Sequence, residues 1–173
     1  MILGIDIDDT ITNTSKTVRE YLKAEYPDYD EYKKLPRKEY RKFLKKNLDK
    51  MRNEYTLKEG VKEAWEYFKE NNFDIIIITA RSNKFSRNNI KNTIKFLERH
   101  NIWYDKIYFK QVKKGKKAFK NHVDLFIDDK EQVLDGVYSY GITCLCMGHS
   151  EKYLSFDNWY QILDYIKEEY HGR

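Results

Sequence analysis

Short apolar runs alternate with amphipathic stretches along most of the chain. Five of the runs have the length and apolar character of β-strands, and two of these, at 73–79 and 123–128, are apolar enough to be buried on both faces of a sheet. The five expected strands are residues 1–6, 73–79, 106–109, 123–128 and 142–147.

The stretches between the strands show helical periodicity, because apolar residues recur there at intervals of three and four. The stripes are Val61, Ala64, Trp65 and Phe68, then Ile90, Ile94 and Leu97, and finally Trp159, Ile162, Leu163 and Ile166. Strands that alternate with helices in this way predict an α/β fold, a parallel sheet with helices on both faces.

Residues 14–56 interrupt the alternation, because they contain no strand-like run. One helix is expected to begin near Ser15 and to end before Pro27, and Pro36 fits the first turn of a second helix that runs to about Arg52. We therefore expect a small helical insertion after the first strand. The expected division is a core of residues 1–13 and 57–173 and an insertion of residues 14–56.

The positive charge of the chain is concentrated in this insertion. The sequence has 33 Lys and Arg against 28 Asp and Glu, a formal net charge of +5. Residues 14–56 hold 13 of the basic residues and 8 of the acidic ones, so the insertion accounts for the whole excess. Two interpretations are open: a solvated, Lys-rich helical pair that covers one end of the sheet, or a cap that shapes access of a substrate.

The sequence predicts neither a membrane span nor a disulfide. No run approaches the ~18–20 uninterrupted apolar residues of a membrane span, and the first apolar stretch ends at Asp6. The two cysteines, Cys144 and Cys146, lie two positions apart in an apolar strand, where they are interpreted as small buried residues. We therefore expect a cytoplasmic protein in a reducing compartment.

Polar residues end three of the expected strands and continue directly after them. They are Asp6, Asp8, Asp9 and Thr10 at the end of the first strand, Thr79, Ala80 and Arg81 at the end of the second, and Asp128 and Asp129 at the end of the fourth. Because the carboxyl ends of parallel strands meet at one edge of a sheet, we expect these residues to gather there. Any single aspartate could instead cap a helix or begin a turn, but three strand ends share the same chemistry.

Carboxylates crowded at one edge would repel one another unless a cation lay among them. Mg²⁺ prefers oxygen ligands and is usually held by one or two carboxylates together with phosphate oxygens of a substrate. The pattern therefore predicts Mg²⁺ as the cofactor and phosphoryl transfer as the chemistry.

Four sequence elements resemble the motifs of the haloacid dehalogenase (HAD) superfamily, in order and over residues 2–129. They are Asp6-Ile7-Asp8-Asp9-Thr10, the Thr79 that ends IIIITAR, a lysine before VDLFIDD, and the Asp128–Asp129 pair. The resemblance implies a Rossmann-like core with a small helical cap inserted after the first strand. The IDD ending and the position of the insertion most resemble the small 5′(3′)-deoxyribonucleotidases and related nucleotidases, although TAR stands where many of them have a TS-type motif.

The resemblance implies a role for each residue of the first motif. Asp6 would be the nucleophile that forms an aspartyl-phosphate. Asp8 would protonate the leaving oxygen and then activate water, while its backbone carbonyl helps to bind the metal. Thr10 would orient Asp8 or satisfy amides of the turn, and Asp9 is expected to be a turn residue.

The remaining motifs would bind phosphate and metal. Thr79 and the amide of Ala80 would hold a phosphoryl oxygen, and Arg81 would contact the substrate or form a structural ion pair. The catalytic lysine is expected at Lys114, with Lys113 and Lys117 as alternatives. Asp129 would bind the metal directly, and Asp128 would support it from the adjacent position. The predicted metal ligands are thus Asp6, Asp8, Asp128 and Asp129.

The leading interpretation is a Mg²⁺-dependent phosphatase that acts on a small phosphomonoester, and a nucleotide is the favoured substrate. A phosphatase for polynucleotide ends is a second interpretation, motivated by the basic excess of residues 14–56. A non-catalytic module that binds phosphate and metal is a third. No membrane partner is expected.

Overall fold

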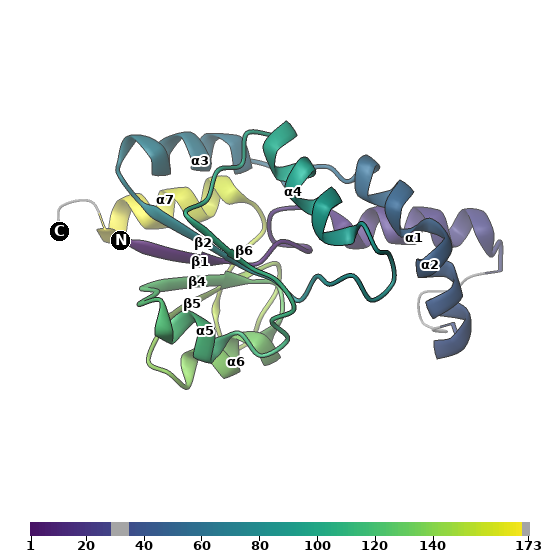
Figure 1. Cartoon of the computed structure of the whole chain (residues 1–173). Helices are drawn as coiled ribbons and strands as arrows, with labels where there is room; N and C mark the ends of the chain where they lie inside the picture. The colour runs from purple at the N-terminus through teal and green to yellow at the C-terminus, as the bar shows by residue number, and fades with distance from the viewer. Residues whose placement is uncertain (29–34, 171–173) are drawn as a thin grey trace.

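The computed structural model describes residues 1–28 and 35–170, and it contains a six-stranded parallel sheet (Figure 1). The elements are β1 (Ile2–Ile5), α1 (Thr14–Glu25), α2 (Arg37–Glu54), α3 (Val61–Glu70), β2 (Asp74–Ile78), α4 (Asn89–Arg99), β3 (Lys106–Tyr108), α5 (Gly115–Lys120), β4 (Leu125–Asp128), α6 (Glu131–Tyr138), β5 (Thr143–Met147), β6 (Leu154–Phe156) and α7 (Trp159–Tyr170). The predicted α/β fold is confirmed. The strand β6 was not expected, because it has three residues and begins with the half-exposed Leu154.

The strand order is β3-β2-β1-β4-β5-β6, and every neighbouring pair is parallel. β1 therefore lies in the middle, with Gly4 between Ile76 of β2 and Phe126 of β4. A Cβ atom at Gly4 would lie 2.4 Å from a ring carbon of Phe126, so glycine allows the aromatic ring to lie across the central strand.

Helices cover both faces of this sheet, as the apolar pattern predicted. Along β2, Ile75 and Ile77 join one buried cluster with α3, α4 and α7, whereas Ile76 and Ile78 join a second cluster with α5 and α6. In Figure 1, α3 and α7 lie on one side of the sheet and α5 and α6 on the other. Burial on both faces explains why β2 and β4 have near-continuous apolar sequences.

Helices α1 and α2 lie beyond the edge where the strands have their carboxyl ends (Figure 1). The apolar side of α2 contributes Phe43, Leu48 and Met51 to the same buried cluster as α3, α4 and α7. Pro36 precedes α2 instead of lying in its first turn, and the helix continues to Glu54. The division of the chain into a core and a cap stays a prediction.

The cysteines are buried as expected. Cys144 and Cys146 are free thiols, and both side chains lie on the α5–α6 face of β5. Among residues 1–28 and 35–170, no helix is both long and apolar enough to cross a membrane.

Candidate active site

The predicted site residues meet at the carboxyl ends of the three central strands. Ile5 of β1 lies beside Ile77 of β2 and Ile127 of β4 in the sheet register. The backbone amide of Asp6 donates a hydrogen bond of 3.0 Å to the carbonyl of Ile127, which continues the ladder one residue further. Asp6 is thereby held beside the strand that ends in Asp128.

Lys114 joins two of these carboxylates. Its Nζ lies 2.6 Å from Oδ1 of Asp6 and 2.6 Å from Oδ2 of Asp128, and all three side chains are at most 5% exposed. Of the three candidate lysines, Lys114 is the one at the carboxylates, because Lys113 is exposed and Lys117 lies over the ring of Tyr108. Two buried anions thus share one buried cation.

The loop before α5 explains how Lys114 reaches this position. The backbone amides of Lys110 and Gln111 donate to the carbonyls of Arg81 and Thr79, so the loop follows the end of β2. At Gly115, an added Cβ would lie 2.1 Å from the carbonyl oxygen of Gly136, so only glycine lets α5 pack this closely on α6.

Burial dominates the electrostatics of Asp6. It raises the pKa of this carboxyl to about 6, with Lys114 opposing the shift and Asp128 adding to it. Burial also raises the pKa values of Asp128 and Asp129, against the opposing charges of Lys114 and Lys130 respectively. The pKa of Lys114 is raised as well, because its two carboxylate partners outweigh the effect of burial. When all three are ionised, the carboxylates of Asp6, Asp128 and Asp129 outnumber the ammonium groups of Lys114 and Lys130 by one.

Asp6, Asp128 and Asp129 are arranged as ligands of a cation. Each offers a carboxylate oxygen, and these oxygens lie within 4.8 Å of one another. An all-oxygen donor set with excess negative charge fits Mg²⁺. The side chain of Asp8 is not part of this set, which leaves only its backbone carbonyl for the role that the sequence suggested.

Asp8 instead lies between two arginines. Nη2 of Arg81 is 2.6 Å from Oδ1 of Asp8, its Nε is 3.1 Å from both carboxylate oxygens, and Nη1 of Arg52 is 3.3 Å from Oδ1. The hydroxyl of Thr14 donates a further hydrogen bond of 2.8 Å. Burial would raise the pKa of Asp8, but the two guanidinium groups more than offset it and hold the pKa far below its ordinary range.

Arg52 is a site residue that was not expected from the sequence. This side chain is 5% exposed, donates from Nε to the Asn89 side chain at 2.8 Å, and packs over the ring of Tyr55. A signal was present, because Arg52 falls on the stripe of α2 that also contains Leu48 and Met51. A charge on a buried stripe requires a partner, and here the partner is Asp8.

Arg81 forms the structural ion pair that the sequence left open. Its guanidinium is 1% exposed and also donates to the hydroxyls of Thr93 and Thr12. All of these bonds direct the side chain toward Asp8.

Thr10 does not take the part expected of it. Its hydroxyl is buried and has no hydrogen-bond partner among the described residues, while its carbonyl accepts a bond of 2.8 Å from the indole of Trp159. Thr14 bonds to Asp8 in its place. The reason is the turn at Asp9, where φ is +58°, because this turn brings the start of α1 back toward Asp8.

Asp9 is a turn residue, as expected, and it also binds the first turn of α1. Its carboxylate accepts a hydrogen bond of 2.8 Å from the amide of Ser15 and a second bond from the Ser15 hydroxyl. Asp9 therefore stabilises the helix start and is not directed at the carboxylate cluster.

Thr79 and Ala80 lie where β2 ends. The hydroxyl of Thr79 is buried and accepts a hydrogen bond of 3.2 Å from the amide of Arg81. Ala80 is exposed, and its amide makes no backbone hydrogen bond within the described parts of the chain. The Ala80 amide is thus free to bind an anion.

No protein-family model and no curated protein matches the sequence. Solved structures match it over nearly their whole length. A predicted phosphatase from Clostridium acetobutylicum aligns with a TM-score of 0.71 at 13% identity, covering 96% of this chain and 98% of that one. A HAD-superfamily hydrolase from Ehrlichia chaffeensis aligns with a TM-score of 0.63 at 16% identity, covering 96% of each chain.

CbbY from Rhodobacter sphaeroides, solved in complex with phosphate, aligns with a TM-score of 0.62 at 13% identity, covering 93% of this chain and 95% of that one. At these identities the likeness concerns the fold. The chain therefore has the fold of HAD-superfamily hydrolases, with a carboxylate cluster at the carboxyl ends of its central strands.

Proposed function

We propose that this protein is a Mg²⁺-dependent phosphomonoester hydrolase that acts through an aspartyl-phosphate on Asp6. The observation that carries the proposal is the buried arrangement of Asp6, Lys114 and Asp128, with Asp129 beside it and Asp8 two residues along the chain. The shared fold with HAD-superfamily hydrolases supports it.

In the first step, a carboxylate oxygen of Asp6 attacks the phosphorus, and the bond from phosphorus to the ester oxygen breaks. Lys114 orients Asp6 and neutralises part of the charge on the phosphate. The Thr79 hydroxyl and the free amide of Ala80 hold a phosphoryl oxygen. In the second step, water attacks the aspartyl-phosphate, which releases inorganic phosphate and restores Asp6.

Asp8 takes up a proton from solvent when the substrate binds, gives it to the leaving oxygen in the first step, and takes one from water in the second. Arg81 and Arg52 keep Asp8 ionised before a substrate arrives. An incoming phosphate raises the pKa of Asp8, because like charge disfavours ionisation, and it competes for the same guanidinium groups. Both effects prepare Asp8 to act as an acid only when a substrate is present.

Asp6, Asp128 and Asp129 would hold Mg²⁺, together with the backbone carbonyl of Asp8. When bound, the ion would supply positive charge that reduces the repulsion between the nucleophile and the phosphate. Asp128 also keeps Lys114 in place and accepts a hydrogen bond from the amide of Lys130.

The substrate that we propose is a small phosphorylated molecule, specifically a nucleotide cleaved by a 5′(3′)-nucleotidase activity. The support is the resemblance of the Asp128–Asp129 ending and of the inserted helices to that group. Helices α1 and α2 would act as a small cap over the sheet edge, since α2 delivers Arg52 to Asp8. The free, buried Cys144 and Cys146 support a reducing, cytoplasmic setting.

The test is phosphate release from a panel of nucleotides, sugar phosphates and p-nitrophenyl phosphate, with and without Mg²⁺. We expect turnover that requires Mg²⁺ and that falls by on the order of 10⁴-fold in Asp6→Asn. Asp74→Asn is the matched control, because Asp74 is exposed and begins β2, at the end of the strand opposite to the candidate site. Full turnover by Asp6→Asn would overturn the mechanism, and tight binding without release across the panel would favour a non-catalytic module.

A further inference from the structure

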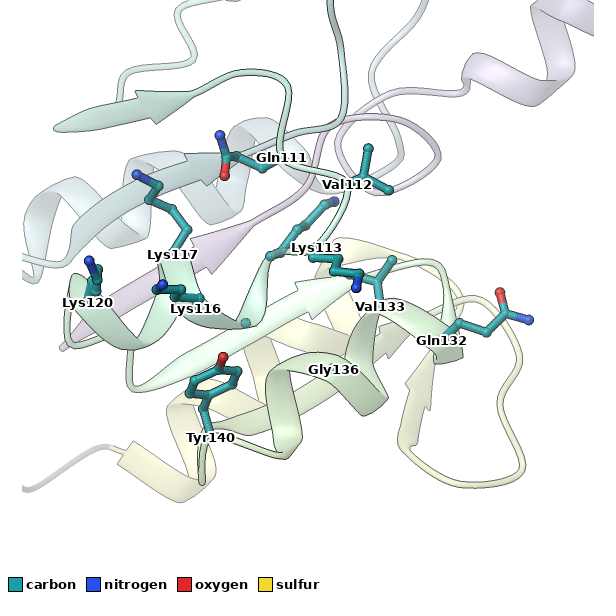
Figure 2. A pocket seen from close by; sticks show the side chains of 12 residues that line it. Gln111, Val112, Lys113, Lys116, Lys117, Lys120, Gln132, Val133, Gly136 and Tyr140 are labelled. Atoms are coloured by element: carbon teal, nitrogen blue, oxygen red, sulfur yellow. The ribbon is translucent and has the colours of Figure 1, made fainter.

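A pocket of about 690 Å³ lies on the α5–α6 side of the sheet, next to the carboxylate cluster (Figure 2). Its walls come from the loop before α5, from α5 itself, from one side of α6 and from Tyr140. Among the described residues, five lysines and no acidic residue line it. The lysines are Lys113, Lys114, Lys116, Lys117 and Lys120.

Most of these lysines lack the ion pairs seen elsewhere on the surface. Lys46, Lys130 and Lys152 each lie 3.1–3.3 Å from a carboxylate. Within the described residues, by contrast, Lys113, Lys116 and Lys120 make no ion pair, and Lys117 lies with its Nζ 4.3 Å from the centre of the Tyr108 ring. Ammonium groups gathered along one short segment repel one another unless an anion lies between them.

Aromatic rings lie beside the lysines. Tyr140 is 41% exposed and lines the pocket, and Phe119, which is 56% exposed, has its ring centre 5.5 Å from that of Tyr140. Lysines that neutralise phosphates and exposed rings on which bases stack are the two components of a single-strand nucleic-acid site.

The pocket adjoins the candidate active site at Lys114. This residue lines the pocket, and its ammonium group contacts Asp6 and Asp128. A chain of phosphates bound along the pocket would therefore have its end near Lys114, the residue that contacts the nucleophile.

We propose that this pocket, which we call the lysine groove, binds the backbone of a single-stranded oligonucleotide whose terminal phosphate is hydrolysed at Asp6. The inference rests on the proposed phosphatase function and assigns it a polymeric substrate. It places the nucleic-acid-binding surface on α5 and α6. The basic excess of the sequence, by contrast, lies in residues 14–56. The two locations can be separated by mutation.

The groove variant is Lys113→Gln/Lys116→Gln/Lys120→Gln, and the matched control is Lys38→Gln/Lys42→Gln/Lys45→Gln on α2. All six lysines are exposed, and each variant removes three positive charges. Binding is measured by fluorescence anisotropy with a labelled twelve-residue oligothymidylate that carries a 3′ or a 5′ phosphate, in an Asp6→Asn background that prevents turnover. We expect the groove variant to weaken binding about tenfold or more and to reduce the slope of log Kd against log salt by about 2, and the α2 variant to change neither.

With Asp6 restored, hydrolysis of the same oligonucleotide is compared with that of p-nitrophenyl phosphate. The ratio of the two kcat/KM values should fall about tenfold in the groove variant and stay unchanged in the α2 variant. Equal losses in the two variants, or no oligonucleotide binding by a protein that hydrolyses p-nitrophenyl phosphate, would overturn the inference and leave the phosphatase function intact. If no substrate is hydrolysed, the phosphatase function fails, and with it the inference.

Vesicles containing phosphatidylserine provide the remaining comparison. If the groove variant loses binding to these vesicles while the unaltered protein ignores the oligonucleotide, the groove is a membrane-binding surface and the inference is wrong. We expect the unaltered protein to bind the oligonucleotide more tightly than the vesicles, because stacking on Tyr140 and Phe119 adds to the charge attraction.

Discussion

Asp6 and Asp8 are two residues apart, yet their surroundings shift the pKa values of their carboxyl groups in opposite directions. Asp6 shares the single ammonium group of Lys114 with Asp128, and burial raises its pKa to about 6. Asp8 has two guanidinium groups to itself, and its pKa lies far below the ordinary range. The difference arises because the two residues face different neighbours. Asp6 lies beside the end of β4, whereas Asp8 lies beside the end of β2 and beside α2.

This contrast suits two different tasks. A carboxylate that is under-neutralised attracts a divalent cation and a phosphate group. A carboxylate that is over-neutralised stays ionised until another anion competes for its arginines. The three predictions that follow test whether these environments cause the difference.

The largest expected effect comes from removing the cation of the Asp6 environment. Lys114→Met should lower kcat for p-nitrophenyl phosphate by about 10²–10³-fold, because no other cation among the described residues forms an ion pair with Asp6. Lys113→Met, next along the chain but exposed, is the control and should retain turnover. Equal losses in the two variants would show that general positive charge, and not the contact with Asp6, is what matters.

The second prediction compares the stability of Asp6→Asn and Asp8→Asn in metal-free protein at pH 7.5. Asp8→Asn leaves two buried guanidinium groups without their anion, so we expect the free energy of unfolding to fall by about 3 kcal/mol. Each kcal/mol should lower Tm by roughly 2–4 °C. Asp6→Asn should melt at the same or a higher temperature. The raised pKa of Asp6 means that its stabilising contribution is present below its unfolded pKa and is lost as the pH rises through about 6.

Thermal melting followed by circular dichroism, in the presence of EDTA, measures both variants. We expect Asp8→Asn to be the less stable variant. The order would be reversed if the attraction between Asp6 and Lys114 stabilised the protein by more than the burial of the Asp6 carboxylate destabilises it. A greater loss in Asp6→Asn than in Asp8→Asn would therefore contradict the contrast.

The third and smallest effect is the pH dependence of Mg²⁺ affinity. A cation requires ionised carboxylates, so a proton on Asp6 competes with it below about pH 6, and affinity at pH 5 should be about tenfold lower than at pH 7.5. Asp8 stays ionised throughout this range, so Asp8→Asn removes no titrating group. It should keep the pH dependence and move it only slightly to lower pH, because the charge of Asp8 contributes to the raised pKa of Asp6. Titration calorimetry at pH 5, 6 and 7.5 provides the measurement, and an affinity that is flat with pH would rule out the raised pKa of Asp6.

Much of the fold could be predicted from local pattern. The five apolar runs and the three stripes became strands and helices with bounds close to those expected, because period and burial are properties of neighbouring residues. The short β6 escaped this reasoning, since its three residues are defined only by pairing with β5. The gathering of Asp6, Thr79 and Asp128 at one edge also followed, because parallel strands place their carboxyl ends together.

Partners across long separations could not be predicted in the same way. The sequence indicated that Arg81 would meet either a substrate or an acidic residue, and Asp8 lies 73 positions away. Arg52 was hidden within a helix that reads as Lys-rich and solvated, although it lies on the buried side of α2. Thr14, and not Thr10, bonds to Asp8, because the left-handed residue Asp9 turns the chain back toward Asp8.

By itself, the sequence determined the alternation of elements, the edge of the sheet where polar residues gather, and the kinds of groups available there. These depend on periodicity and on the order of the strands, which are local properties. Only the tertiary structure decided which cation neutralises which carboxylate. Lys114 joins Asp6 to Asp128, and Arg81 and Arg52 meet at Asp8, because chain packing brings together groups that lie up to 108 positions apart.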